Sequence, residues 1–183
     1  GLGDVYKRQV LEASKKNNIK KFIYAASASC YGAFPTFPTN EKNKIPKIIA
    51  VSKTFKIDHI LPLIEYGHLD YGENKVQEAV EKWAEVKEKN SSLKIHLIGK
   101  LQTNKVKKAV QIFDFIHSVD SKKLADTLKK RETEINRKLS YFIQINLGNE
   151  IQKGGIHKSE TEDFLSYCRD DLKINIVGLM AIP

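Results

Sequence analysis

The stretch Lys47-Ile-Ile-Ala-Val-Ser-Lys53-Thr54 is a short, nearly uninterrupted apolar run that ends in a lysine and a threonine. It is typical of a buried strand in a parallel sheet, and it would place the Lys53 amine at the carboxyl end of that strand. An amine held there is partly shielded from water, which favours its uncharged form and makes it a nucleophile toward aldehydes, as in Schiff-base lysines. The alternative is a lysine that ends a strand and points into solvent.

The rest of the chain alternates between strand and helix patterns. Apolar runs predict six strands, at residues 47–52, 68–72, 94–99, 113–118, 140–146 and 174–182. Helical spacing of apolar residues predicts the helices between them, at 57–66, 73–89, 102–111, 121–137 and 159–169. We expect Ser121 and Ser159 to be N-caps of the last two helices. This alternation predicts a parallel α/β sheet, either a (β/α)8 barrel or an open doubly wound sheet.

Polar side chains follow most of these strands at their carboxyl ends. They include the Lys53 amine, the amides of Asn74 and Asn146 and the hydroxyl of Ser118. Active sites of parallel α/β proteins lie at the carboxyl ends of the strands. We therefore expect one polar rim there, suited to a small ligand with several hydrogen-bonding atoms.

Five motifs carry a family resemblance that covers about residues 45–183. In chain order they are Ile48-Ile-Ala-Val-Ser-Lys-Thr54, Tyr71-Gly-Glu-Asn-Lys-Val-Gln-Glu78, His96-Leu-Ile-Gly-Lys-Leu-Gln-Thr-Asn-Lys105, Ile116-His-Ser-Val-Asp-Ser121 and Gly178-Leu-Met-Ala-Ile-Pro183. Together they resemble the pyridoxal-phosphate homeostasis protein family, whose fold is similar to the barrel of alanine racemase. The resemblance implies an α/β fold of the (β/α)8 TIM type.

The resemblance also implies a cofactor and its site. Lys53 would form a Schiff base with pyridoxal 5′-phosphate (PLP), surrounded by Asn74, His96, Ser118, Asn146 and Met180. For the last four of these residues, a core or supporting role is the alternative. Members are regarded as cytoplasmic cofactor carriers that keep free PLP low without established turnover, and the intact proteins are expected to be monomers. We therefore expect no enzyme; a PLP-dependent racemase and a non-binding fragment are the alternatives.

The chain departs from the family pattern at its end. The family would add further βα units with a phosphate-binding stretch, whereas this sequence stops at Pro183, at the close of the sixth predicted strand. We therefore expect residues 47–183 to form a partial barrel of about six strands, incomplete at its C-terminus. Open sheet edges would make it a poor candidate for a stable monomer. Lys153 is a candidate phosphate contact, and a solvated loop lysine is the alternative.

The first part of the chain follows another pattern. Residues 10–46 resemble a fragment of an extended short-chain dehydrogenase, the nucleotide-sugar epimerase type, with a strand predicted at 22–26. We expect an unrelated short αβ fragment there. Residues 1–9 have no apolar segment of the signal-peptide kind and are expected to be a non-native leader.

The two resemblances meet near Lys53. The epimerase family carries a Tyr-x-x-x-Lys motif in which the tyrosine is the acid/base. Counting back from Lys53 places Ile49 at the tyrosine position, and isoleucine has no proton to transfer. We therefore expect no epimerase chemistry from this chain.

Composition narrows the classes of partner. The chain has 31 Lys+Arg against 22 Asp+Glu, a net charge of +9, which could attract phosphate ligands or nucleic acid. No RNA-binding signature accompanies the charge, so we expect solvated lysines and no nucleic-acid partner. Cys30 and Cys168 have no metal or disulfide spacing, which indicates a reducing cytoplasm. No apolar run is long enough to span a bilayer, and no histidine pattern indicates a zinc site.

Overall fold

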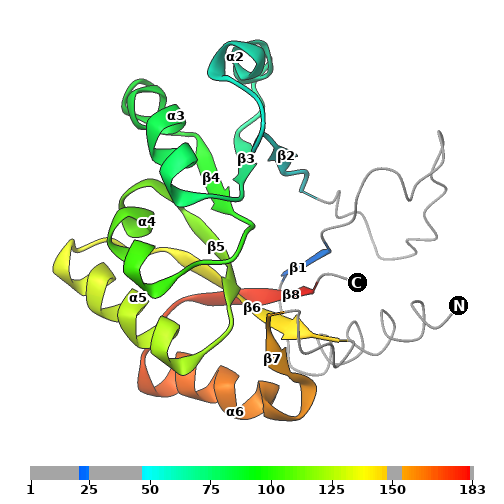
Figure 1. Cartoon of the computed structure of the whole chain (residues 1–183), viewed down its shortest axis with the longest axis vertical. Helices are drawn as coiled ribbons and strands as arrows, with labels where there is room; N and C mark the ends of the chain where they lie inside the picture. The colour runs from blue at the N-terminus through cyan, green and yellow to red at the C-terminus, as the bar shows by residue number, and fades with distance from the viewer. Residues whose placement is uncertain (1–20, 25–46, 148–153, 182–183) are drawn as a thin grey trace, which may run out of the picture.

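The computed structural model describes residues 21–24, 47–147 and 154–181, which contain a parallel sheet with helices packed along it (Figure 1). The strand order is β1-β8-β6-β5-β4-β3-β2, and β7 pairs with β6. The strands are β1 Lys21–Tyr24, β2 Ala50–Val51, β3 Asp70–Glu73, β4 Lys94–Leu97, β5 Phe115–Val119, β6 Ser140–Asn146, β7 Ile156–His157 and β8 Ile176–Ala181. From β2 to β6 each strand lies beside the next one in the chain. This order is that of a barrel, because a doubly wound sheet reverses direction part-way.

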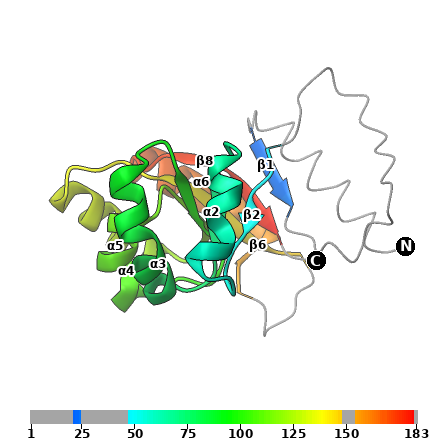
Figure 2. The ribbon, with the colours of Figure 1, turned by 90° about the horizontal axis from the view of Figure 1, so that it is seen from above.

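Five described helices connect the strands. They are α2 Ile57–Glu65, α3 Val76–Lys89, α4 Val106–Ile112, α5 Lys122–Glu134 and α6 Thr161–Ser166. A 3₁₀ turn precedes α4, and a π-helical turn at Tyr167–Asp171 extends α6. Figure 2 shows α3, α4 and α5 along the same side of the sheet. None of the described helices is long and apolar enough to cross a membrane.

The hydrophobic core lies between the sheet and these helices. Trp83 of α3 is fully buried, and its ring centroid lies 4.8 Å from that of Tyr71 in β3. Ile95 and Leu97 of β4 are buried in the same cluster. Because side chains alternate along a strand, His96 between them faces the opposite, inner side of the sheet. The sheet therefore has an apolar outer face and a separate inner face.

The first predicted strand is shorter and more exposed than its sequence indicates. Only Ala50–Val51 pairs with β3, and Ile48 and Val51 are 71% and 50% exposed. The prediction of a buried strand over 47–52 is therefore wrong. The reason is that β2 lies at the end of the described strand order, so an apolar run that suits a buried strand has a sheet neighbour on one side only.

Of the two predicted N-caps, one is found at a helix start and the other is not. The Ser121 hydroxyl accepts a hydrogen bond from the Leu124 N–H at 3.4 Å, which confirms it as the cap of α5. Ser159 instead lies inside a 3₁₀ turn that His157 caps, and α6 begins at Thr161 without a side-chain cap. The prediction for Ser159 is wrong because the extra turn moves the helix start two residues along the chain.

The strand predicted near residue 22 lies in the same sheet as the others. β1 pairs in parallel with β8, with Phe22 opposite Leu179. The expectations for residues 1–9, for the rest of 10–46 and for Lys153 fall outside the described residues. The division of the chain into an epimerase-like fragment and a barrel stays a prediction.

Candidate functional site

Lys53 lies in a tight turn directly after β2. The Ser52 N–H donates to Gly72 O at 2.9 Å, and the Phe55 N–H donates back to Ser52 O at 3.1 Å. The Lys53 side chain is exposed, so the predicted shielding of its amine is wrong for the described chain. The cause is again the edge position of β2. The structure thus places an accessible amine at the carboxyl end of a strand.

A buried carboxylate lies directly beneath this turn. Glu73 has no exposed surface, and its Oε1 accepts from Ser52 Oγ at 2.7 Å, Lys82 Nζ at 2.9 Å and Trp83 Nε1 at 2.9 Å. Lys82 Nζ also donates to Ser52 O at 2.7 Å. We call these four residues the Glu73 cluster. Glu73 was expected to begin a helix, but it is the last residue of β3, because its carboxylate collects donors from both neighbouring elements.

Asn74 follows β3 and is half-buried at the same end of the sheet. A Cβ atom on Gly99 would lie 2.3 Å from Asn74 O, so the loop after β4 approaches this carbonyl as closely as glycine allows. This close approach places Asn74 beside the loop that follows β4.

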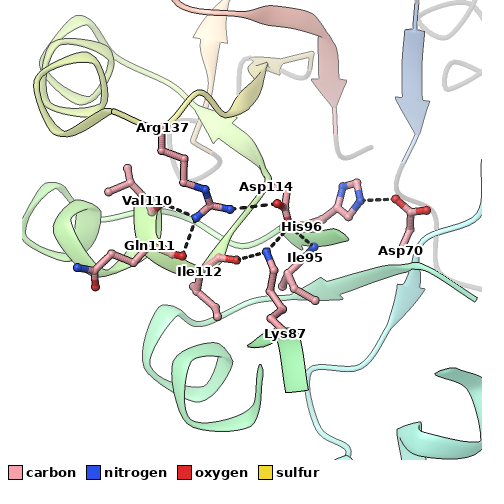
Figure 3. Close-up of polar contacts among 9 residues, drawn as sticks. All are labelled: Asp70, Lys87, Ile95, His96, Val110, Gln111, Ile112, Asp114 and Arg137. Carbon is pink, nitrogen blue, oxygen red and sulfur yellow. Dashed lines mark hydrogen bonds and ion pairs between the residues drawn. The ribbon is translucent and has the colours of Figure 1, made fainter. Parts of the chain in front are cut away.

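His96 lies away from the rim, on the inner face of the sheet. Its Nε2 is 2.9 Å from Oδ1 of Asp70, the first residue of β3 (Figure 3), and its Nδ1 is 3.0 Å from His117 Nε2. Its ring stacks on that of Phe115, the first residue of β5, with centroids 4.3 Å apart. The expectation that His96 surrounds the cofactor stays a prediction, with a supporting role as its alternative. Both ring nitrogens are occupied by partners inside the sheet.

Burial sets the protonation of this inner group. Desolvation lowers the pKa of His96 despite the neighbouring Asp70 carboxylate, and desolvation together with His96 lowers the pKa of His117 to about 3. Burial raises the pKa of Asp70, but the Lys47 amine and His96 more than offset this and leave the pKa below its usual value. Near pH 7 the carboxylate is charged and both rings are neutral. His96 therefore donates from Nε2 to Asp70, and His117 donates from Nε2 to His96 Nδ1.

The other predicted site residues lie in or at the ends of three strands. Ser118 is buried beside a register shift in β5, and its Oγ has no hydrogen-bond partner among the described residues. Asn146 is the half-buried last residue of β6. Met180 of β8 is buried and lies opposite Gln144 of β6. Lys53, Asn74 and Asn146 thus mark the carboxyl ends of β2, β3 and β6. In the described part of the chain, no group of His, Cys, Asp and Glu is arranged to hold a metal ion.

The family model for the N-terminal domain of alanine racemase matches residues 39–183. The chain belongs to this family. The match confirms the alanine racemase-like fold expected from the sequence motifs, and with the strand order it identifies the described sheet as part of a (β/α)8 barrel.

Individual relatives agree with this assignment. The chain is 39% identical over 137 residues to the pyridoxal phosphate homeostasis protein of Pasteurella multocida and 36% identical to that of Aquifex aeolicus, covering 75% of this chain and 59% of each relative. The chain therefore spans about three fifths of the length of these curated relatives.

Solved structures give the same result. PipY of Synechococcus elongatus without PLP superposes with a TM-score of 0.69 at 38% identity, covering 74% of this chain and 62% of PipY. PipY with PLP bound gives 0.67 at 36% identity, covering 76% and 65%. Alanine racemase of Clostridium difficile, at 12% identity and a TM-score of 0.58, covers 74% of this chain and 35% of that enzyme; it shares the fold alone.

The described chain has a further polar group that the sequence predictions did not select. Gln144 Nε2 donates to Gly154 O at 2.9 Å. A Cβ atom on Gly154 would lie 3.3 Å from Asp120 Oδ2 and 3.9 Å from Lys100 Nζ. Lys100 directly follows the strand predicted at 94–99, and Asp120 lies two residues after the strand predicted at 113–118. These positions at strand ends are the sequence signal that could have identified both residues. An ammonium, a carboxylate and an amide thus gather at the ends of β4, β5 and β6.

Proposed function

We propose that this chain is a PLP-binding protein of cofactor homeostasis, which carries the cofactor as a Schiff base on Lys53 and has no turnover of its own. The observation that carries the proposal is the position of Lys53. Its exposed amine leaves a fixed turn at the carboxyl end of a barrel strand. Relatives at 36–39% identity are named pyridoxal phosphate homeostasis proteins, and PipY has been solved with PLP bound.

The chemistry needs only the amine and the aldehyde. Uncharged Nζ of Lys53 adds to the aldehyde carbon, and loss of the aldehyde oxygen as water leaves a C=N bond. No oxidant, reductant or metal takes part. The exposure of Lys53 supports direct access of a free aldehyde from solvent.

Other strand-end residues fit the remainder of such a ligand. Ser118 Oγ is buried without a partner among the described residues, and it can donate to or accept from a bound polar group. We propose Asn74, Ser118, Asn146 and Met180 as cofactor contacts beside Lys53. We assign His96 a supporting role beneath the site, because both of its ring nitrogens are already hydrogen-bonded.

The test is covalent trapping. Purified protein is mixed with PLP, the visible Schiff-base band is recorded, and the product is reduced with borohydride and mapped by peptide mass spectrometry. We expect one label, on Lys53, that is lost in Lys53→Met and kept in Lys56→Met. Lys56 is the matched control because it is an exposed lysine of the same loop. Labels spread over many lysines, or none, would instead identify a chain that shares the fold without binding PLP.

A second candidate is a PLP-dependent enzyme acting on amino acids. The fold shared with alanine racemase favours it, although that likeness concerns the fold alone. The chain with PLP would be incubated with single amino acids in deuterated water. Deuterium at Cα that requires Lys53 would support an enzyme, and its absence for all of them would support a carrier.

A further inference from the structure

Within the Glu73 cluster, Ser52 is hydrogen-bonded to both Glu73 and Lys82, and Ser52 immediately precedes Lys53. Three side chains donate to Glu73 Oε1: Ser52, directly after β2, and Lys82 and Trp83 of α3. Lys82 Nζ bridges Glu73 to the carbonyl of Ser52, which is the carbonyl of the peptide bond to Lys53. The same carbonyl accepts the Phe55 N–H that closes the turn. Every polar atom of Ser52 is therefore hydrogen-bonded.

β2 is joined to the described sheet by few backbone contacts. Only two residue pairs join it to β3, and it lies at the end of the described strand order. Short edge strands with exposed side chains open easily. Nearby apolar side chains at Ile48, Val51 and Phe55 are at least half exposed, and the packing here comes from the partly buried Ala50 and Ile57. The hydrogen bonds that Ser52 makes with Glu73 and Lys82 act directly on the turn.

We propose that Lys82 and Glu73 are positioning residues for Lys53, which hold the Ser52–Lys53 peptide so that the amine leaves the turn in one direction. The inference rests on the proposed function of Lys53. An amine on a fixed peptide reacts faster with a bound aldehyde and forms a more stable adduct, because less conformational freedom is lost on binding.

A purely stabilising role explains the cluster less well. A buried ion pair loses much of its attraction to the cost of removing both charges from water, and apolar side chains of similar size often stabilise as much. The Lys82 side chain is 11% exposed and that of Glu73 is fully buried, so both charges are largely desolvated. Apolar side chains would not donate a hydrogen bond to Ser52 O. The Lys82 ammonium does, and this hydrogen bond is made to the turn that carries Lys53.

The test compares Lys82→Met in α3 with Lys75→Met at the N-cap of the same helix. Lys75 makes an exposed ion pair with Glu78, so its replacement is the matched control. Two quantities are measured: the PLP concentration that half-saturates the Schiff-base band, and hydrogen exchange of the 51–56 peptide without PLP. We expect Lys82→Met to weaken PLP binding on the order of tenfold, which is the size of effect seen when residues that orient metal ligands are replaced. We also expect it to speed hydrogen exchange of the Phe55 amide. Lys75→Met should change neither.

Exchange in α5 reports whether the variant remains folded. If Lys82→Met also speeds hydrogen exchange in α5, the same two measurements are made on Glu73→Gln. This variant keeps an acceptor for Ser52 and Trp83 while removing the charge opposite Lys82. Faster exchange at 51–56 with unchanged PLP binding overturns the inference and leaves the proposed function intact. A wild-type chain that takes no label on Lys53 overturns the proposed function and the inference together.

Discussion

His96 and Asp70 are joined by a 2.9 Å hydrogen bond on the inner face of the sheet, between β4 and the first residue of β3. The bond fixes the proton of His96 on Nε2 and leaves Nδ1 to accept from His117. Rings stack against both histidines, Phe115 on His96 and Phe142 on His117. The inner face therefore carries two neutral imidazoles, each stacked on an aromatic ring.

Acid should destabilise the protein through His117. Its pKa is about 3 in the folded state and about 6.5 when unfolded, so between these values the unfolded state binds the extra proton. The stabilisation is fully present above about pH 6.5 and is lost as pH falls toward 3, by about 1.4 kcal/mol per pH unit for one such group. Urea unfolding at several pH values measures this. His117→Gln keeps an N–H donor without titrating in this range, and its stability should fall less steeply; an equal slope would contradict the assignment.

Gly99→Ala should be destabilising. The new Cβ would lie 2.3 Å from the Asn74 carbonyl oxygen, which is backbone and has little room to move. We expect a loss of about 1–3 kcal/mol or more in the free energy of unfolding. Gly154→Ala is the control, because its nearest neighbour is a side-chain oxygen of Asp120 at 3.3 Å, which can shift. Chemical denaturation of both variants checks the order, and equal losses would count against it.

Arg137→Met should destabilise the fold without affecting Lys53. Arg137 donates to Asp114 Oδ1 at 3.0 Å and to the carbonyls of Val110 and Gln111 at the end of α4 (Figure 3). The partners are partly exposed, so we expect a loss of about 1–2 kcal/mol.

These contacts lie at the amino-terminal side of the strands, since Asp114 directly precedes β5. That side of a barrel serves stability, so PLP labelling of Lys53 should be unchanged in Arg137→Met. Arg131→Met removes an exposed ion pair with Glu134 and is the control, expected to cost well under 1 kcal/mol. A thermal denaturation series distinguishes the two, and a loss of Lys53 labelling would show that this side reaches the site.

Ser121→Ala should cost more stability than Ser159→Ala. The Ser121 hydroxyl accepts the Leu124 N–H of α5, and loss of an N-cap typically costs about 0.5–2 kcal/mol. The 3.4 Å distance favours the lower part of that range. Ser159 caps no helix, so its replacement should have a smaller effect. Melting temperatures of the two variants provide the comparison, and the reverse order would refute it.

Sequence patterns predicted the alternation of strands and helices from residue 47 onward and the position of Lys53 at a strand end, and the motifs predicted the barrel family. These features are local. Apolar runs of strand length and amphipathic helical spacing are patterns of neighbouring residues, and each motif is one continuous stretch of sequence. The N-cap at Ser121 is local in the same way, because its acceptor and donor are three residues apart.

Which of these groups are buried, and what they contact, depends on how the chain folds in three dimensions. An apolar run does not reveal that β2 lies at the end of the described strand order, so the sequence left open whether Lys53 is shielded or points into solvent. Glu73 and His96 take their roles from partners distant in the chain: Ser52 is 21 residues from Glu73, and Asp70 is 26 residues from His96. Hydrogen bonding and desolvation depend on such long-range neighbours, which are fixed only when the strands pair.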